Sequence, residues 1–589
     1  MEHAGAKGWL WMSIDQPGCR PAWLGLVFLL TIAGCGDGLP DAGKAAGLKV
    51  DTLYVGRHIL TMDDATGPVT AVAVAGETIV WVGDHADWSG HASKVIELGE
   101  RALLPGFIDT HGHLSFLART VNLANLAPPP VGSVTDIASL QQTMAEYIAA
   151  RDLEPGDWVV GVGYDDSLIA EQRHPDRDDL DAVSTEHPIA LIHVSGHLMT
   201  TNSAALQEAR ITADTPSPAG GVIRRRSQSE EPNGVLEETA MGPLSGLFLG
   251  DAGLSAEVID AALTEYARFG VTTIQDSAAS WELYALLAAI AADTGLKLDV
   301  LLFPLGMDGN FALPQGVELS TYRDRLKVGG TKLLLDGSPQ GKTAYLSLPY
   351  HVVPEGLPGD YRGYPMMTSK RAERLIGHYL ATGVPMQIHA NGDAAADVLL
   401  DAVAAAFADT PIADHRTVMI HAQTVRDDQL DRMQALGIIP SFFAAHVFYW
   451  GDWHRDSVLG PERAARISPT ASSLERGLPF TLHNDAPVVP PDMLRLLWAA
   501  THRETRSGRI LGESQRIPTL EALRAVTANA AHQSFEEHQK GSLSPGKQAD
   551  LVVLSANPLD IAPEALLELE VLSTVSRGVT VYDAGRDGP

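Results

Sequence analysis

The sequence predicts an α/β protein whose main part is a closed (β/α)8 barrel of the TIM type, with a large insertion after the first strand and a small β-domain made from both chain ends. Two patterns lead to this prediction. Apolar runs of four to six residues, each ending in polar residues, alternate with Ala- and Leu-rich helical stretches through the middle of the chain. Short β-branched runs separated by Gly and Asp lie near both ends. The 589 residues are enough for one large domain with an accessory module.

Composition and charge exclude several classes of protein. The chain is 45% hydrophobic and 20% charged, which is ordinary for a globular protein and excludes a wholly disordered one. Its formal net charge of −30 is unfavourable for nucleic-acid binding, and the short basic run Arg224–Arg226 does not change that. Both cysteines, Cys19 and Cys35, precede the part expected to fold. Cysteine-ligated zinc, iron–sulfur clusters, a cysteine nucleophile and internal disulfides are therefore excluded from that part.

Residues 1–34 resemble the signal peptide of a bacterial lipoprotein. The uncharged run Ala22–Gly34 has thirteen residues, fewer than the roughly 20 that span a bilayer but typical of the apolar part of a signal peptide. It ends in the motif IAGC at Cys35, which resembles the lipobox, where the cysteine is acylated. The alternatives are an ordinary cleaved signal or a non-functional apolar N-terminus. We expect lipidation of Cys35, a tether over residues 35–48, and an extracytoplasmic location in the cell envelope with membrane contact through the lipid only.

The two chain ends, residues 49–102 and 541–589, are rich in strand-forming residues. The first contains LYVGRHILTM, AVAVAGETIVWVG and KVIELG, and the second contains ADLVVLS and VLSTVSRGVTVYD. Neither segment is long enough to bury a core alone, so we expect the two to pair into one β-domain.

Residues 103–495 carry the barrel pattern. Eight apolar runs end in polar residues: FIDTHGH, VTTIQDS, LKLDVLLFP, TKLLLDGS, PMQIHANGD, TVMIHAQ, GIIPSFFAAH and PFTLHNDAP. Helical segments such as 368–382 and 394–408 separate them, and residues 496–540 supply the last helices. A Pro- and Gly-rich stretch from about 121 to 263 interrupts this rhythm and is the expected insertion. In a barrel of this kind the chemistry lies at the carboxyl ends of the strands.

Histidines and one aspartate close several of these runs. His111 and His113 alternate on one strand, so both side chains point to one face and can reach one metal; two surface histidines are the alternative. His389 and His421 each end a separate run. One such histidine is often a core residue, but two of them with an upstream His-X-His motif favour a metal site. Asp485 ends PFTLHNDAP, where a carboxylate can bind a metal and accept a proton from water; an Asx-turn before the following proline is the alternative.

Two further segments carry candidate functional residues. Lys332 lies inside the apolar run TKLLLDGS, where an unpaired ammonium is costly to bury. Carbamylation by CO2 would convert it into an anionic ligand that bridges two metals, whereas a salt-bridged or snorkelling lysine is the alternative. Asp336 is the nearest alternative carboxylate. The segment 442–454, FFAAHVFYWGDWH, either lines a pocket for an apolar or aromatic group, with His446 as a substrate contact, or is a packed helix.

Seven motifs together resemble the amidohydrolase superfamily: LLPGFIDTHGH, VTTIQD, TKLLLDGS, QIHANGD, MIHAQ, HNDAPV and KGSLSPGKQADLVVL. They are similar in particular to the amidohydrolase-3 branch, which includes N-substituted formamide deformylases. The resemblance extends from about residue 51 to residue 583 and implies a metal-dependent (β/α)8 barrel with a β-sandwich built from both chain ends. SGHLMTTNSAAL with His197, and GVLEE with Glu238, resemble two further motifs of the branch, which implies that Glu238 is a ligand or substrate contact.

The resemblance also implies the metal ligands. The first metal is expected on His111, His113 and Asp485, and the second on His389 and His421, with carbamylated Lys332 as the bridge. Some relatives use one metal only. The chain departs from the usual pattern in HANGD and at Asn484, which removes no proposed ligand but changes groups around them.

These observations predict a metal-dependent hydrolase of a non-peptide C–N bond, in an amide or an N-acyl or N-formyl amine. Asp485 is expected to move the proton of the attacking water, and His197 to stabilise the oxyanion. One or two divalent ions are expected, with zinc the leading candidate and Mn, Fe or Co compatible with the same nitrogen and oxygen ligands. The expected partner is a small-molecule substrate; a homodimer is left open. The alternatives are an ester or phosphoester hydrolase or an isomerase on the same scaffold, or a catalytically silent binding lipoprotein.

Overall fold

The structure, a computed structural model, describes residues 45–587 except 121, 152, 250–253, 355, 409–411 and 413. The side chains of residues 248, 249 and 587 are also outside the description. The predicted signal segment, Cys35 and the tether up to residue 44 lie outside the described residues. Within the described part, no helix combines the length and apolar character needed to cross a membrane.

The predicted α/β class is confirmed, and its centre is formed by two parallel sheets. The first contains β7 (Phe107–Ile108), β14 (Val271–Ala279), β15 (Asp299–Pro304) and β17 (Leu326–Val328), with the antiparallel β16 (Tyr322–Arg323) at its edge. The second contains β18 (Thr331–Leu334), β19 (Met386–Ala390), β20 (Val418–His421), β21 (Ile439–Phe442) and β22 (Thr481–Leu482).

Contacts at both edges connect these two sheets. At one edge a parallel bridge links Leu305, just after β15, to Lys332 in β18. At the other edge the backbone N–H of Asp485 donates to the carbonyl of His111 at 3.1 Å, and the Thr110 hydroxyl donates to the carbonyl of Leu482 at 3.1 Å. The carboxyl ends of strands from both sheets are therefore brought together at one place.

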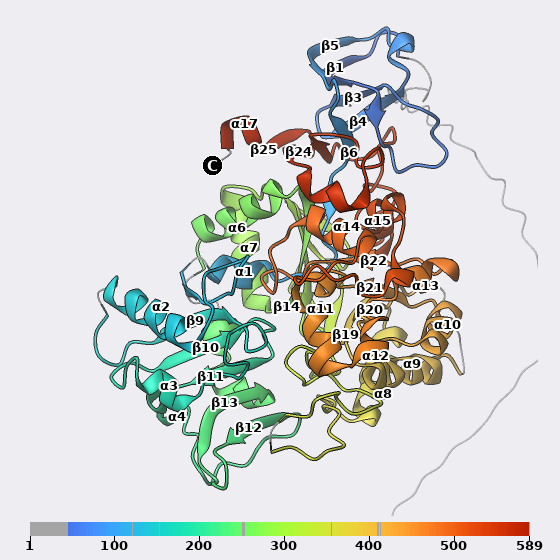
Figure 1. The fold of residues 1–589 in the computed structure, drawn as a ribbon. Helices are drawn as coiled ribbons and strands as arrows, with labels where there is room; N and C mark the ends of the chain where they lie inside the picture. The colour runs from blue at the N-terminus through green and yellow to red at the C-terminus, as the bar shows by residue number, and fades with distance from the viewer. Residues whose placement is uncertain are drawn as a thin grey trace, which may run out of the picture. The chain divides into compact units, whose positions relative to one another are not determined.

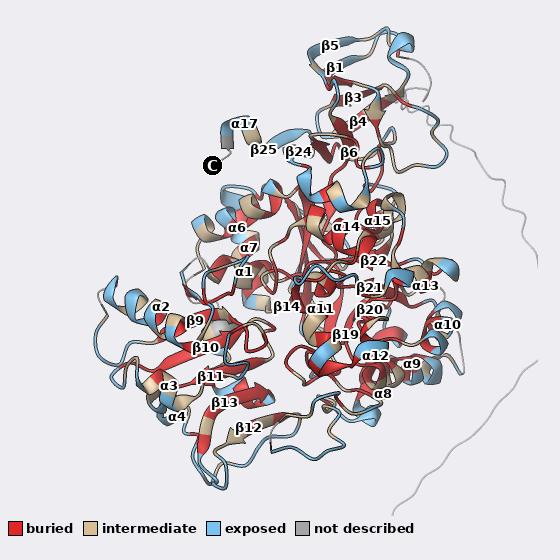
Figure 2. Cartoon of the chain, viewed as in Figure 1, coloured by how far each residue is buried: buried red, intermediate tan, exposed pale blue. Residues whose placement is uncertain are grey.

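Helices cover the outer faces of these sheets, and their sequences show why they form. Figure 1 shows α8 (Ser369–Ala381), α9 (Asp393–Phe407) and α10 (Asp427–Leu436) on one side and α6 (Ala256–Arg268) and α7 (Trp281–Asp293) on the other. In α8 the Thr368 hydroxyl caps the first turn by accepting the N–H of Arg371. Its buried residues recur at helical spacing: Ala372, Leu375, Ile376, Tyr379 and Leu380. The strands that these helices cover, such as β19, are buried along their whole length (Figure 2).

A separate six-stranded sheet lies in chain order between β7 and β14. Its order is β12 (Gly221–Arg225), β13 (Pro232–Glu238), β11 (Leu198–Thr201), β10 (Ile189–His193), β9 (Val159–Tyr164) and β8 (Ala124–Asn125). Alternate residues of β10 enter two different cores: Ile189 and Leu191 pack with α2 (Ile137–Ala149), whereas Ala190 and Ile192 pack on the opposite face. We call this unit the inserted sheet.

The two ends of the described chain meet in a pair of small sheets. One has the order β4 (Thr78–Gly83), β3 (Ala71–Ala75), β1 (Lys49–Val55) and β5 (His91–Glu97). The other has the order β2 (His58–Ile59), β6 (Ala102–Pro105), β23 (Leu551–Leu554), β24 (Val571–Ser576) and β25 (Val579–Asp583). Antiparallel pairing of β6 with β23 joins the two ends, and Val74, Leu103 and Leu551 belong to one buried cluster.

Buried ion pairs tie the C-terminal segment to the central sheets. Lys540 Nζ lies 2.6 Å from Asp299 Oδ2 and donates to the Thr273 hydroxyl at 3.0 Å, and Arg577 also pairs with Asp299 at 2.9 Å. Burial alone would raise the pKa of Asp299, but the charges of Lys540 and Arg577 lower it overall, so the carboxylate stays ionised.

Replacing Lys540 by methionine should lower stability by about 3 kcal/mol, because the buried Asp299 carboxylate loses its shortest ion pair and keeps only Arg577 at 2.9 Å and Arg325 at 3.6 Å among the described residues. The midpoint of urea unfolding, followed by tryptophan fluorescence, measures the change. Lys370→Met on the exposed face of α8 is the matched control and should change stability by less than about 0.5 kcal/mol. Equal midpoints for the two variants would contradict the proposed stabilising role of the buried pair.

Candidate metal centre

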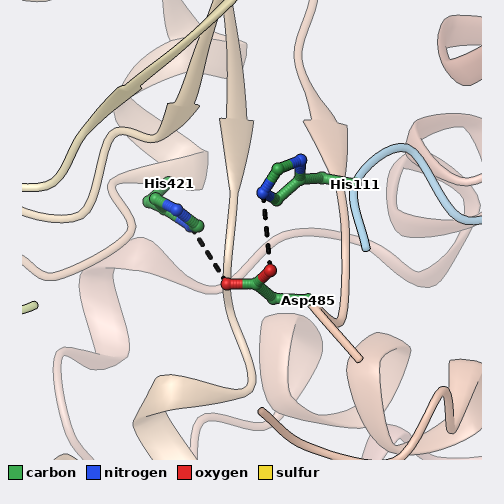
Figure 3. Close-up of side chains that lie close together, drawn as sticks. All are labelled: His111, His421 and Asp485. Carbon is green, nitrogen blue, oxygen red and sulfur yellow. Dashed lines mark ion pairs between the residues drawn. The ribbon is translucent and has the colours of Figure 1, made fainter. Parts of the chain in front are cut away.

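Six of the residues singled out in the sequence lie together at the carboxyl ends of the central strands. His111 and His113 follow β7, Lys332 lies in β18, His389 lies in β19, His421 ends β20, and Asp485 follows β22. Asp485 Oδ1 is 3.4 Å from His111 Nε2 and 3.2 Å from His113 Nε2. Figure 3 shows the imidazoles of His111 and His421 on either side of the Asp485 carboxylate. Except for the partly exposed His113, all six are buried.

The protonation of His113 and His389 follows from their hydrogen bonds to backbone carbonyls. His113 Nδ1 lies 2.7 Å from the carbonyl oxygen of Ser277, and His389 Nε2 lies 3.0 Å from that of Gly337. A carbonyl oxygen only accepts, so we assign the ring protons to these nitrogens; Asn391 Nδ2, 3.1 Å from His389 Nε2, donates to the same Gly337 carbonyl. The opposite nitrogens, His113 Nε2 and His389 Nδ1, are therefore unprotonated in the neutral rings.

The protonation of His111 is set by a buried amide. His111 Nδ1 lies 3.2 Å from Gln387 Oε1, which also accepts the Ser277 hydroxyl at 2.7 Å. The Gln387 amide nitrogen donates instead to the carbonyl of Thr110 and to Gln275. Because Oε1 is the acceptor, His111 donates from Nδ1 and leaves Nε2 unprotonated. Burial lowers the pKa of His111 and of His389 well below the usual value, so both rings are neutral.

The unprotonated imidazole nitrogens and the Asp485 carboxylate are electron-pair donors that point toward one another, with no proton between them. Burial alone would raise the pKa of Asp485, and only positive charge at the position of the His111 and His113 nitrogens, on the rings or on a bound cation, lowers it and keeps the carboxylate ionised. Its Oδ1 atom is buried and has no hydrogen-bond partner among the described residues. A buried anion facing imidazole lone pairs is unfavourable unless a cation lies between them. The nitrogen and oxygen donors present thus fit a divalent transition-metal ion.

Lys332 and Asp336 differ in their capacity to act as ligands. Lys332 Nζ lies 3.0 Å from His111 Nε2, and burial lowers the pKa of this lysine to about 7. Asp336 accepts three backbone N–H groups, from Tyr345, Asn391 and Gly392, at 2.8–3.0 Å. These bonds use both carboxylate oxygens, so Asp336 supports two loops of the site rather than presenting a free ligand atom.

The inserted sheet contributes a histidine–glutamate pair beside the centre. His197 Nδ1 lies 2.8 Å from Glu238 Oε2, and the His197 ring centroid is 4.9 Å from that of His389. Burial lowers the pKa of His197, but the charge and hydrogen bond of Glu238 outweigh this and raise it overall. Glu238 has a strained backbone with φ +50°, and its buried Oε1 has no hydrogen-bond partner in the described part of the chain. Only glycine fits at Gly337, because a Cβ there would lie 2.0 Å from Glu238 Oε1.

His446 begins α11 (His446–Trp453) in the aromatic segment and is buried. Its Nδ1 lies 2.9 Å from His454 Nε2, and the two rings are stacked at 17°. Phe443 and Trp450 contact the same ring. The segment is therefore packed as a helix, with His446 held by a neighbouring histidine.

A second cluster of metal-ligand types, which the sequence patterns did not predict, lies in the inserted sheet. Asp165, Asp166 and His193 offer ligand atoms within 4.8 Å of one another. However, the backbone N–H of Ser195 donates to His193 Nδ1, so His193 Nε2 carries the proton and donates to Asp166 at 3.0 Å. Asp165 accepts the indole N–H of Trp450 at 2.6 Å. This cluster satisfies its own hydrogen bonds and connects the inserted sheet to α11.

Comparisons with known proteins identify the family and the fold of the chain. Residues 94–582 match the model of the Amidohydrolase family. The chain is 30% identical over 550 residues to the N-substituted formamide deformylase of Arthrobacter pascens, covering 90% of this chain and 98% of that protein. It is 27% identical over 552 residues to the putative amidohydrolase YtcJ of Bacillus subtilis (strain 168), covering 90% and 99%. An uncharacterized metal-dependent hydrolase from Pyrococcus horikoshii matches with a TM-score of 0.64 and 22% identity over 87% of this chain and 99% of that one, which shows a shared fold.

The two clusters should differ in metal binding. His421→Asn should lower the divalent-metal content of the purified protein, because it removes the imidazole nitrogen that faces the unprotonated nitrogen of His389. His193→Asn should leave the metal content unchanged. Elemental analysis after purification without chelator measures both. A loss of metal on His193→Asn would show that the hydrogen-bonded interpretation of the second cluster is wrong.

Proposed function

Because the chain belongs to the amidohydrolase family, we propose that it cleaves a non-peptide C–N bond in an amide or an N-acyl or N-formyl amine. The observation that carries the proposal is the convergence of unprotonated imidazole nitrogens on the ionised Asp485. The similarity to an N-substituted formamide deformylase over most of both chains supports this class of bond. The substrate is a small molecule.

In this proposal His111, His113 and Asp485 would hold one divalent ion, and His389 and His421 would hold a second. Zinc is the leading candidate, and manganese, iron and cobalt suit the same donors. Lys332 would bridge the two ions as a carbamate. Its buried amine, with a pKa lowered to about 7, can be neutral and add to CO2; the product is an N-carboxylate plus one proton. The 3.0 Å distance between Lys332 Nζ and His111 Nε2 supports a position of the Lys332 side chain between the two sets of ligands.

The chemistry follows from the roles of the surrounding side chains. A bound divalent cation supplies a water of lowered pKa and polarises the substrate carbonyl. Asp485 Oδ1, free of other hydrogen bonds among the described residues, accepts a proton from the attacking water. The water oxygen bonds to the carbonyl carbon, the C–N bond then breaks, and Asp485 returns the proton to the leaving amine. The products are a carboxylic acid and an amine.

His197 and Glu238 complete the site from the inserted sheet. Glu238 holds His197 by Nδ1 and favours its protonated form, as the raised pKa of His197 indicates. We assign His197 the role of donating a hydrogen bond to the carbonyl oxygen as negative charge develops on it. His446 is held by His454, so a direct substrate contact by His446 is a secondary element of the proposal.

The remaining sequence predictions belong to the same proposal. The two parallel sheets are taken to form one closed (β/α)8 barrel over residues 103–495, followed by helices to 540, because hydrogen bonds or bridges join both of their edges. The inserted sheet is taken as the insertion of about 121–263, and the end sheets as one β-sandwich of 49–102 and 541–589. The chain is proposed to be lipid-anchored at Cys35 in the cell envelope.

Loss of the Asp485 carboxylate should reduce turnover at least about 100-fold even when metal is supplied in excess, because proton transfer would lose its acceptor. The test compares wild type with Asp485→Asn on a panel of N-formyl and N-acyl amines, detecting the released amine and measuring metal content in parallel. Asp401→Asn on exposed α9 is the matched control and should keep full activity. Failure of the metal-loaded wild type to release any amine would refute the proposed bond class, and near-full turnover of metal-loaded Asp485→Asn would refute the role of Asp485.

The bridging role of Lys332 predicts a metal count. Elemental analysis of the wild type should give about two equivalents of divalent metal per chain, falling to about one in Lys332→Ala because the bridging anion is lost. Lys370→Ala, on the exposed face of α8, should leave the count unchanged. A single equivalent in both wild type and Lys332→Ala would contradict the bridged pair of ions.

A further inference from the structure

Three buried polar side chains, those of His483, Ser441 and Thr110, continue a series of hydrogen bonds that starts at His421. His421 Nδ1 is 3.1 Å from His483 Nε2, and His483 Nδ1 is 2.8 Å from the Ser441 hydroxyl. The Ser441 hydroxyl is 3.2 Å from that of Thr110, which in turn is 3.1 Å from the carbonyl oxygen of Leu482. All four side chains are at most 4% exposed. They come from β20, from β21, from the residue directly after β22, and from the segment after β7.

Which atom donates in each of these hydrogen bonds is determined at Thr110, the residue farthest from His421 in the series. The Leu482 carbonyl can only accept, so the single Thr110 hydroxyl proton is directed to it. Thr481, which is also near Thr110, directs its own proton to Gln533 at 2.6 Å. Thr110 therefore accepts the Ser441 proton, and Ser441 accepts the N–H of His483 Nδ1. His483 Nε2 is then unprotonated and accepts from His421 Nδ1.

The consequence lies at the opposite nitrogen of His421. With its proton on Nδ1, His421 leaves Nε2 unprotonated, and this atom is 3.0 Å from His389 Nδ1, which is unprotonated for the separate reason that His389 donates to Gly337. If every donor and acceptor in this series were exchanged, the Leu482 carbonyl would lose the hydrogen bond from Thr110. A proton would then lie on His421 Nε2, between this nitrogen and His389 Nδ1, the two expected ligand atoms.

We propose that His483 and Ser441 are positioning residues that fix the tautomer of His421, so that Nε2 of His421 is available to a metal ion beside Nδ1 of His389. This inference rests on the metal centre of the proposed function. His483 is not itself a ligand, because both of its ring nitrogens are used within the chain of hydrogen bonds. The role is that of an outer hydrogen-bond partner that orients a ligand and fixes its proton.

The experiment compares metal affinity in the full chain for wild type, His483→Phe and Ser441→Ala. Affinity is measured by competition with a chromogenic chelator, and the ligand field is measured by the visible spectrum after Co²⁺ loading. His483→Phe should bind metal about 10- to 100-fold more weakly and change the Co²⁺ spectrum, because His421 loses the acceptor for its Nδ1 proton. Ser441→Ala should shift both readouts in the same direction without removing a ring from the core.

Rescue and control variants separate this role from general destabilisation. His483→Gln keeps an oxygen that can accept from His421, and Ser441→Thr keeps the hydroxyl, so both should bind metal more tightly than the corresponding Phe and Ala variants. Ser473→Ala is the matched control: Ser473 is equally buried and donates to the carbonyl of Pro469, outside the chain of hydrogen bonds. Its metal affinity and Co²⁺ spectrum should equal those of wild type.

Three results would overturn the inference. Wild-type affinity and spectra in both His483→Phe and Ser441→Ala would refute the positioning role while leaving the metal centre intact. Loss of a whole equivalent of metal in His483→Phe with no effect of Ser441→Ala would make His483 a ligand instead. A wild type that binds no divalent metal would refute the proposed function and, with it, this inference.

Discussion

The mutual repulsion of a buried carboxylate and several imidazole lone pairs is the constraint around which the rest of the molecule is arranged. Each ring is held in this unfavourable orientation by an acceptor from another segment: the carbonyls of Ser277 and Gly337, and the amide of Gln387. The acceptors lie on or beside strands that run parallel in two connected sheets, so the register of the sheets determines which nitrogen faces the centre. A cation converts this repulsion into attraction, which is why the site and the fold are coupled.

The inserted sheet places a second set of groups against this centre without sharing its strands. The His197–Glu238 pair approaches His389, and the close fit of Glu238 against Gly337 fixes how near it comes. The hydrogen bond from Trp450 to Asp165 holds the same sheet against α11. Because the inserted sheet contributes none of the expected metal ligands on the central strands, its sequence can vary while those ligands stay the same. Variation of this kind allows one scaffold to serve different substrates.

Much of the arrangement of the central sheets could be predicted from the sequence, because short apolar runs alternate with segments of helical periodicity. Polar residues that end apolar runs must lie at one edge of a parallel sheet, and this pattern predicts the placement of His389, His421 and Asp485. The supporting residues carry no such signal: Gln387, Ser441 and His483 are polar positions within or beside buried strands, and their partners are distant in sequence. The hydrogen bonds that engage Asp336 come from two loops, whose paths depend on tertiary packing. The acidic pair after β9, Asp165 and Asp166, does have a sequence signal, because two adjacent carboxylates directly follow an apolar run.

The pairing of β6 with β23 also has a consequence for how the chain is made. Until β23 and β24 have been synthesised, β6 lacks its long-range antiparallel neighbour, and the buried cluster shared by Leu103 and Leu551 is incomplete. Loop closure over nearly the whole chain must therefore come late, after the central sheets have brought the two ends close together. A nascent or C-terminally shortened chain would expose this strand edge, the kind of surface on which chaperones and aggregation compete. The last strands thus act as a check on completeness, since the sheet that contains β2 and β6 is finished only when β23, β24 and β25 have joined it.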